Sequence, residues 1–170
     1  GMTGFVVVAA EHCEAEHIAF MARQARGLVC LAMTPQRCEE LELPLMVEGD
    51  DSLSPFTLSI EAATGIDTGI SAADRARTVR VAVDASSQAS DLVQPGHIFP
   101  IAAAVGGVLT RTAPAEAAMD LTTLAGLLPS AVFTEVLDND GAVADADYLL
   151  GFADQHQLVV GQVSDLGTYR

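Results

Sequence analysis

Residues 56–80, FTLSIEAATGIDTGISAADRARTVR, contain the succession of elements that decides the fold. The opening FTLSIEAA alternates between apolar and polar side chains, which is typical of a strand with one buried face. Ser71 and Asp74 follow as a pair that resembles a capping box, which predicts a helix that runs to about Val83. A strand is therefore joined to a helix by a short, glycine-containing turn.

The same mixture of elements continues on both sides of this segment. Further strands are predicted at residues 5–9, 28–33, 105–110, 131–137 and 158–163. Further helices are predicted at residues 14–25, 34–43, 115–125 and 145–156, with loops at residues 48–55 and 88–100. Strands and helices do not alternate in strict βαβ order. The sequence therefore predicts an α+β fold, with a mixed, twisted β-sheet covered by helices in a layered sandwich, as a single domain over residues 1–170.

The charge balance excludes several classes of partner. The chain has 23 acidic and 8 basic residues, for a formal net charge of −15. A surface with this balance cannot neutralise a run of phosphates, so we expect neither nucleic acid nor an anionic membrane surface as a partner. A small phosphorylated ligand needs only one or two local cations and stays compatible with the composition.

The cysteines indicate a reducing compartment. Cys13, Cys30 and Cys38 form an odd set without a CxxC pair, which suits free thiols in the cytoplasm. No apolar run approaches the roughly 18 residues that a membrane span requires. We therefore expect a cytoplasmic protein.

The segment EHCEAEH, residues 11–17, is the first candidate for a metal site. Cys13 and His17 are four residues apart, as are His12 and Glu16, so each pair would share one face of a helix. A metal site needs three or four converging ligands, which two pairs on different faces do not provide. The alternative is a polar helix start whose acidic side chains face the helix dipole, and we expect no metal ligand here.

Two residues are candidates for proton transfer. His97 lies in PGHIFP, where flanking prolines stiffen the loop, and this fits a general acid or base and a structural histidine equally well. Glu135 lies in the apolar segment AVFTEVL, where alternation places it on the same face as Phe133 and Leu137. A carboxylate is costly on such a face unless it is paired or functional, which favours function over a position on the outer face.

The turn GIDTGIS, residues 65–71, is a candidate phosphate site. Its glycines permit the turn, and the Thr68 hydroxyl and the backbone N–H groups at the helix start are suited to bind a phosphate. Arg111 would supply the matching cation. The alternative is an ordinary strand-to-helix turn with Arg111 as a surface arginine.

Longer segments carry a family resemblance. The sequence resembles the 3,4-dihydroxy-2-butanone 4-phosphate synthase family of riboflavin biosynthesis in FTLSIEAATGIDTGISAADRARTVR, DLVQPGHIFP, GGVLTR, EAAMDLTTLAG, GLVCLAMT, LELPLMVE and DLGTYR. The resemblance implies a homodimer with active sites near the subunit interface. It also implies conversion of D-ribulose 5-phosphate to 3,4-dihydroxy-2-butanone 4-phosphate and formate with a divalent cation, Mg²⁺ or Mn²⁺.

The resemblance further implies roles for individual residues. His97 and Glu135 match the family's essential acid and base residues and are expected to converge in the folded protein. Arg111 and Thr68 match positions that bind the substrate phosphate. Cys30 matches a thiol close to the site, so these three are expected to bind substrate.

Departures from the family pattern fall at polar positions. Family members carry an acidic loop of the form DRENEGD, whereas this chain has Thr3-Gly4-Phe5 where Glu-Gly-Asp is expected. We expect the chain to lack the family's N-terminal strand and the rest of that loop. Where the family reads RGGHTEA, Pro114 replaces a metal-binding histidine and Ala115 replaces a phosphate-binding threonine. The loop at residues 48–55 is also shorter and lacks the family's aromatic residue.

The departures favour a degenerate homologue with impaired or lost synthase activity, without metal ligands or a tightly bound cofactor. Such a protein would keep the fold and the dimer, with a sugar phosphate as a candidate ligand, and would bind, regulate or pair with an active relative. One alternative is a synthase with cryptic metal ligands such as Glu116. Another is a metal-free, isomerase-type enzyme that uses His97 and Glu135.

Overall fold

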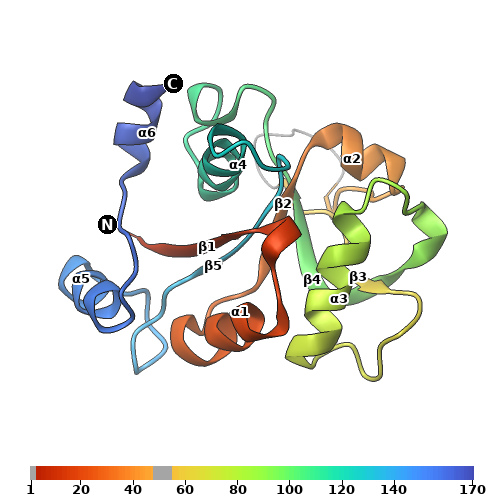
Figure 1. Cartoon of the computed structure of the whole chain (residues 1–170), viewed down its shortest axis with the longest axis horizontal. Coiled ribbons are helices and arrows are strands. Elements are labelled where there is room, and N and C mark those ends of the chain that lie inside the picture. Colours follow the sequence, from red (N-terminus) through yellow and green to blue (C-terminus); the bar gives the residue numbers. More distant parts are fainter. Residues whose placement is uncertain (1–2, 48–54) are drawn as a thin grey trace.

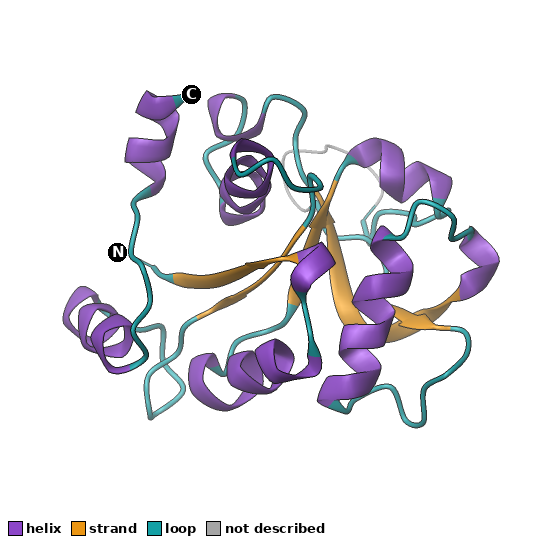
Figure 2. Cartoon of the chain, viewed as in Figure 1, coloured by secondary structure: helices purple, strands orange, loops and turns teal. Residues whose placement is uncertain are grey.

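The computed structural model describes residues 3–47 and 55–170. Within these ranges, five strands form one mixed sheet in the spatial order β1-β5-β2-β4-β3 (Figures 1 and 2). β2 and β4 run parallel, and the other neighbouring strands are antiparallel. The prediction of an α+β fold with a mixed sheet is thus confirmed. The strands are β1 (Phe5–Ala9), β2 (Cys30–Met33), β3 (Ile60–Ala62), β4 (Leu92–Ala102) and β5 (Ala131–Glu135).

Helices cover both faces of the sheet. Figure 1 shows α1 and α3 on one side of the strands and α4 on the other. In the part of the chain that the structure describes, none of the helices combines the length and the hydrophobicity needed to span a membrane. The α-helices are α1 (Ala15–Phe20), α2 (Pro35–Glu40), α3 (Ala72–Val83), α4 (Pro114–Leu124), α5 (Ala146–Gln155) and α6 (Val163–Tyr169). Shorter helical turns occupy Ala10–His12, Met21–Ala25, Ala89–Asp91 and Gly107–Leu109.

Side-chain alternation along the strands divides the core between the two faces. Because successive side chains of a strand point to opposite faces, Val132 packs under α1 and α3, whereas Phe133 packs under α4. Glu135 therefore shares the α4 face with Phe133. The first cluster includes Ile18, Met21, Leu31, Val79, Ile98 and Val132. The second includes Cys30, Ala32, Ile101, Ala115, Ala118 and Phe133.

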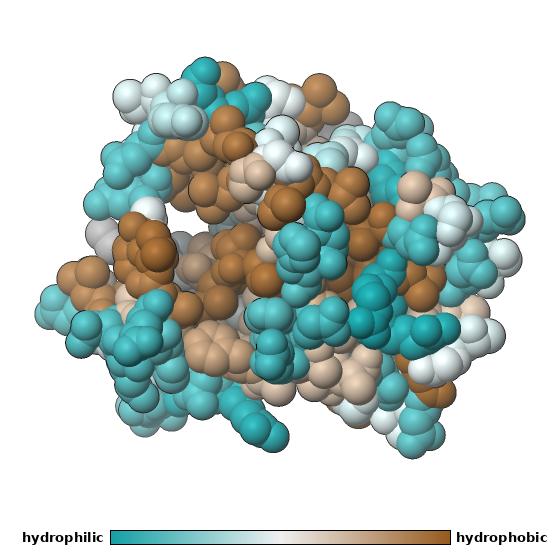
Figure 3. Space-filling view, viewed as in Figure 1, coloured by the Kyte–Doolittle hydropathy of each residue, from teal (hydrophilic) through white to brown (hydrophobic). Residues whose placement is uncertain are grey.

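Hydrophobic residues are also exposed near the C-terminus. Figure 3 shows a hollow bordered by hydrophobic residues in the part of the molecule where α4, α5 and α6 lie. Patches of this kind on soluble proteins commonly mark surfaces of association. The exposed hydrophobic residues in these elements and in the segment between α5 and α6 include Leu121, Leu124, Leu150, Val159, Val160 and Val163.

Local signals located several elements correctly. β1 has the predicted bounds, and α2 begins where the helix at residues 34–43 was predicted, with Thr34 as N-cap, whose Oγ1 accepts a hydrogen bond from the backbone N–H of Arg37 at 3.1 Å. Ser71 caps α3 by accepting from the N–H of Asp74 at 3.0 Å. The Asp74 carboxylate accepts from the N–H of Gly69 at 3.0 Å. The helix start is confirmed, although the pair is not a reciprocal capping box.

β4 occupies most of residues 88–100, so the prediction of a loop there is wrong. Pro95 lacks an N–H donor and would normally interrupt a strand. The register of β3 against β4 shifts between Ile60 and Glu61, and an irregularity of this kind accommodates a residue that cannot donate to the ladder. The strand depends on pairing with β2 and β3, which no local signal reveals.

Two further strand predictions are wrong. Residues 105–110 contain the helical turn Gly107–Leu109, because Gly106 and Gly107 adopt φ angles of 95° and 63° that lie outside the strand region. Residues 158–163 form no strand within the described chain, and α6 begins at Val163. A strand needs a neighbour to pair with, and Val159 is instead fully exposed at 100%.

Several boundaries differ from the predictions. The helix predicted at residues 14–25 is α-helical only to Phe20, and the helical turn Met21–Ala25 that follows ends at Arg26, which has a φ of 70°. Of the strand predicted over residues 56–63, Ile60–Ala62 forms β3, while Phe56 and Thr57 make isolated bridges. The predicted loop at residues 48–55 lies outside the described residues, apart from Pro55.

The close approach of β3 and β4 at Gly96 generates a stability prediction. A Cβ atom at this position would collide with the backbone carbonyl of Ile60, so Gly96→Ala is expected to lower the free energy of unfolding by about 2 kcal/mol. Gly151→Ala in α5 is the matched control, because a Cβ there meets nothing within 4 Å and alanine should stabilise the helix by about 0.5–1 kcal/mol. Urea denaturation followed by circular dichroism measures both. Equal effects would contradict tight packing at Gly96.

Candidate ligand-binding site

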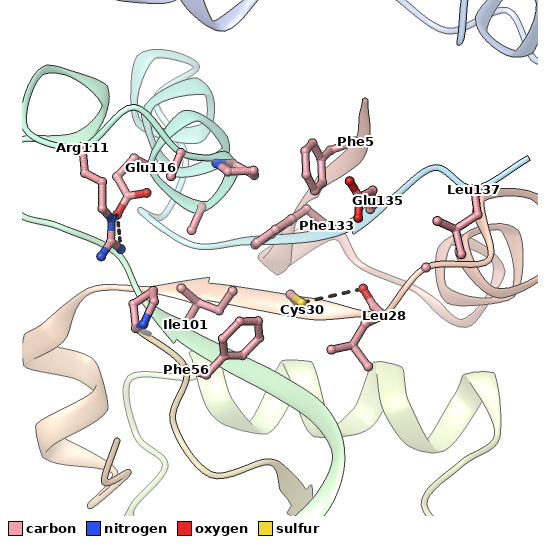
Figure 4. Close-up of a pocket in the computed structure, with 15 residues that line it drawn as sticks. Phe5, Leu28, Cys30, Phe56, Ile101, Arg111, Glu116, Phe133, Glu135 and Leu137 are labelled. Atoms are coloured by element: carbon pink, nitrogen blue, oxygen red, sulfur yellow. Dashed lines mark hydrogen bonds and ion pairs between the residues drawn. The ribbon is translucent and has the colours of Figure 1, made fainter. Parts of the chain in front are cut away.

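A cavity of about 450 Å³ lies between the N-terminus of α4 and the sheet. This volume falls within the range of roughly 300–1,000 Å³ that is typical of small-molecule sites. Figure 4 shows its walls, which come from β1, β2, β4, β5, α4 and the connecting segments. The ionisable side chains of the wall, apart from the Cys30 thiol, are Arg111, Glu116 and Glu135. The remaining lining residues are Phe5, Gly27, Leu28, Pro55, Phe56, Ile101, Ala113, Pro114, Ala115, Phe133 and Leu137.

Glu135 ends β5 and faces the cavity. It lines the cavity together with Phe133 and Leu137, as the alternation of the strand predicted. Phe5 is its partner in the β1–β5 ladder, and the Phe5 and Phe133 rings meet edge to face with centroids 6.1 Å apart. No hydrogen bond joins the Glu135 carboxylate to the other residues drawn in Figure 4. Glu135 therefore presents an ionisable acceptor within an aromatic surface.

Arg111 is held by Glu116, a fully buried carboxylate on α4. Glu116 Oε1 accepts from Arg111 Nε at 2.7 Å and from the backbone N–H of Ala104 at 2.7 Å, and it also pairs with Arg111 Nη2. Arg111 Nη2 donates to the carbonyl of Ala102 at 3.2 Å. The guanidinium proposed from the sequence to bind phosphate is thus engaged within the protein. Glu116 Oε2, by contrast, is buried without a hydrogen-bond partner in the described residues.

Cys30 also lines the cavity, but its thiol is not activated. Burial raises the pKa of Cys30 to about 12, and the thiol donates weakly to the carbonyl of Leu28 at 3.7 Å. A nucleophilic cysteine needs a lowered pKa and a nearby positive charge. Cys30 therefore contributes surface to the pocket rather than reactivity.

The start of α4 carries the apolar replacements. Pro114 is the first helical residue, and Ala113 at the N-cap makes no side-chain hydrogen bond to the helix. Pro114 and Ala115 both line the cavity. Proline lacks an N–H group and alanine a polar side chain. The first turn of α4 therefore offers a ligand little beyond backbone groups, next to the Glu116 carboxylate.

His97 and Thr68 lie outside this cavity. His97 is on β4, and its Nδ1 atom contacts a carboxylate oxygen of Glu61 on β3. The His97 side chain is 43% exposed. Thr68 is exposed in the connection between β3 and α3. Within one chain, the cavity brings Glu135, Arg111 and Cys30 together, but neither His97 nor Thr68 joins them.

Sequence reasoning missed Glu61 and underestimated Glu116. Glu61 is an acidic residue in the alternating segment FTLSIEAA, so the signal that identified Glu135 was present there as well. Glu116 stands between alanines in α4, which is the same signal at helical spacing. In both cases the partner, His97 or Arg111, follows only from the folded chain.

Among the described residues, the cavity wall presents few side-chain ligands to a magnesium ion. Mg²⁺ requires oxygen ligands in near-octahedral geometry, and Glu116 Oε1 already carries Arg111. Beyond the two glutamates, the lining is largely aromatic, aliphatic or proline. Within residues 3–47 and 55–170, no group of three or more His, Cys, Asp and Glu side chains converges.

The segment EHCEAEH has structural partners. The His17 ring accepts from the backbone N–H of Glu14, and the Glu14 carboxylate pairs with Arg80 at 3.0 Å. Glu11 accepts from the N–H of Leu128 at 2.6 Å, and burial raises the pKa of Cys13 to about 12. These contacts support the interpretation as a polar helix start.

Comparisons with known proteins agree with the geometry of the fold. Residues 2–169 match the family described as 3,4-dihydroxy-2-butanone 4-phosphate synthase. A protein of that name from Pseudomonas syringae pv. tomato is 50% identical over 169 residues, covering 98% of this chain and 46% of the relative. One from Pectobacterium atrosepticum is 46% identical, covering 98% of this chain and 78% of the relative. The chain thus spans about half the length of the first of these relatives.

Solved structures are similar over nearly the whole chain. A two-domain 3,4-dihydroxy-2-butanone 4-phosphate synthase from A. baumannii superposes with a TM-score of 0.93 at 46% identity, covering 99% of this chain and 50% of that one. The Candida albicans synthase gives 0.92 at 35% identity, with 98% and 84% covered. A synthase in complex with two magnesium ions gives 0.86 at 36% identity, with 95% and 82% covered.

The Arg111–Glu116 pair is expected to contribute strongly to stability. Arg111→Met should lower the free energy of unfolding by about 3 kcal/mol, because it leaves the Glu116 carboxylate buried without its cation. Arg80→Met is the matched control, since Arg80 pairs with Glu14 at the surface, where the two side chains are 52% and 58% exposed. Its cost should stay below about 1 kcal/mol. Urea denaturation compares the two, and similar costs would refute the structural role of the pair.

The cysteines are expected to be inert in the folded protein. Burial raises the pKa values of Cys13 and Cys30 to about 12 and that of Cys38 to about 11. At pH 8 the thiolate fraction is then on the order of 10⁻³ or less, compared with roughly a quarter for an exposed thiol. Colorimetric titration with an aromatic disulfide should detect the thiols in urea and essentially none beforehand. Rapid labelling of Cys30 in the native protein would contradict its burial.

Proposed function

The chain belongs to the 3,4-dihydroxy-2-butanone 4-phosphate synthase family of riboflavin biosynthesis, and we propose that this member is a non-catalytic, homodimeric binding subunit. It keeps the family's fold and a ligand-sized cavity. It does not convert D-ribulose 5-phosphate to 3,4-dihydroxy-2-butanone 4-phosphate and formate.

One observation carries this proposal. Phe5, Pro114 and Ala115 stand where the family pattern has a carboxylate, a metal-binding histidine and a phosphate-binding threonine, and all three line the same cavity. They are distant in sequence, yet they replace polar groups around one space. Substitutions that accumulated independently over the protein surface would not concentrate these losses in one pocket.

The chemistry of the family reaction explains the consequence. Removal of a proton beside a carbonyl requires stabilisation of the developing negative charge, to which a metal ion contributes several kcal/mol. Each roughly 1.4 kcal/mol corresponds to a tenfold change in rate. Phe5, Pro114 and Ala115 supply no side-chain ligand for this ion at the three positions where the family pattern has polar groups.

In a homodimer, His97 and Thr68 would be able to contribute to a binding site. Both are exposed, apart from the cavity that holds Glu135. The family resemblance implies active sites near a subunit interface, so we propose that these residues approach the cavity of a second copy. Exposed hydrophobic residues on α4, α5 and α6 support association. The free, buried thiols support a cytoplasmic location.

The metal-free isomerase is less well supported. It requires His97 and Glu135 to act on one substrate, and within one chain they do not share a cavity. His97 is also occupied by Glu61. An active synthase with Glu116 as a metal ligand is opposed by the ion pair of that residue with Arg111.

Formate release tests the proposal. With D-ribulose 5-phosphate and Mg²⁺, the protein is expected to release formate at least about 10³-fold more slowly than an active synthase. The Pectobacterium atrosepticum relative, assayed in parallel at the same concentration, controls for substrate and metal quality. Formate release within about tenfold of that control would overturn the proposal.

A further inference from the structure

The C-terminal helix α6 is hydrogen-bonded to the rest of the protein through a single arginine. None of its residues is buried, and the segment over residues 157–162 that leads to it is exposed. Arg170, at the end of α6, donates from Nη1 to the carbonyl of Gly106 and to the carboxylate of Asp120, each at 2.7 Å. Among the described residues, α6 makes no other hydrogen bond beyond residues 162–170. Figure 1 shows this end of α6 beside the segment that precedes α4.

Asp120 on α4 joins this arginine to a turn of the backbone. The residue is only 7% exposed, and its second carboxylate oxygen accepts from the backbone N–H of Val108 at 2.9 Å. Gly107 lies so close that a Cβ atom there would collide with both the Asp120 carboxylate and the Arg170 guanidinium. A carboxylate this deeply buried is costly without its cation. The position of the turn Gly107–Leu109 therefore depends on Arg170.

The same turn is bonded directly to Arg111. The carbonyl of Gly107 accepts from the backbone N–H of Arg111 at 3.0 Å. The Arg111 side chain then reaches the cavity, where it is the cationic group among the described lining residues. A continuous series of hydrogen bonds thus runs from Arg170 through Asp120 and the turn to Arg111.

The two carboxylates of α4 hold this segment in the same way. Glu116 accepts from the backbone N–H of Ala104 and from Arg111 (Figure 4). Asp120 repeats this pattern one helical turn later, with one backbone N–H and with Arg170. Residues four apart share one face of a helix. Because both carboxylates hold the chain between residues 104 and 111, we expect a change at one to be felt at the other.

We propose that Arg170 is a positioning residue for the cavity, because docking of α6 against Asp120 fixes the turn Gly107–Leu109 and, through it, the Arg111 guanidinium. A helix without buried residues undocks at low cost in free energy, which provides the two states that coupling between distant sites requires. Coupling is reciprocal, so a ligand that holds Arg111 in this arrangement also holds α6 in place. The inference rests on the proposed function only in taking the cavity as the binding site.

NMR spectroscopy of the ¹⁵N-labelled protein tests this coupling. Arg170→Met removes both hydrogen bonds of the guanidinium and keeps an unbranched side chain. It should shift the Nε–H signal of Arg111 and raise the hydrogen-exchange rates of that proton and of the Val108 amide by about tenfold. Arg80→Met is the matched control, because Arg80 pairs with Glu14 at the surface. It should change neither rate by more than about twofold.

Further variants separate positioning from helix packing. Asp120→Asn keeps an acceptor for the turn but removes the charge, and it should raise the exchange rate at Arg111 as Arg170→Met does. Combining the two substitutions should add nothing further, because they break the same link. Arg170→Lys keeps a cation and should recover most of the protection of Arg111. If α6 acted by packing alone, lysine and methionine at position 170 would be equivalent.

Three results would overturn the proposal. The first is faster exchange at Val108 with an unchanged Arg111 signal, which would make Arg170 a local tie for α6. The second is no change at Arg111 in Arg170→Met while circular dichroism shows an intact fold, and the third is full additivity of the two substitutions. If Asp120→Asn does not fold, the methionine and lysine variants of Arg170 decide alone. Formate release would refute the proposed function itself, whereas an unchanged Arg111 without formate release would refute only this coupling.

Discussion

The ion pair between Arg111 and the buried carboxylate of Glu116 is the contact on which the site depends. It joins the segment after β4 to the first turn of α4, and the same carboxylate oxygen also accepts from the backbone of Ala104. Arg111 in turn donates to the carbonyl of Ala102, the last residue of β4. Helix, turn and strand are thereby fixed around one end of the cavity. The Arg111 guanidinium is thereby hydrogen-bonded within the protein through Nε and Nη2.

The other side of the cavity is formed by the sheet, whose packing does not depend on the Arg111–Glu116 ion pair. Alternation along β5 sends Val132 to one core cluster and Phe133 to the other, and it leaves Glu135 facing α4. Alanines on α4 let the helix lie close to this face. Phe5, Pro114 and Ala115 line the cavity without disturbing either layer. The proposed function takes these apolar replacements to change what the cavity binds, since a fold can be kept while the function of its site changes.

The sequence allowed the layers, the start of α3 at Ser71 and the orientation of Glu135 to be predicted, because these depend on periodicity and capping within a few residues. It did not reveal that β4 continues through Pro95, since that requires β2 and β3 as neighbours. Nor did it show that Arg111 is engaged by Glu116 or that His97, paired with Glu61, is absent from the lining of the cavity. Resemblance indicated which positions matter, but the pairing of charges depends on tertiary contacts.

We propose that the part of the site that handles metal and phosphate has been lost while the cavity remains. Calorimetric titration of the intact protein with D-ribulose 5-phosphate, in the presence and absence of Mg²⁺, tests this most directly. We expect no saturable heat in either condition, because Pro114 and Ala115 offer no polar side chain where the family pattern has a histidine and a threonine. Saturable binding that strengthens with Mg²⁺ would contradict it.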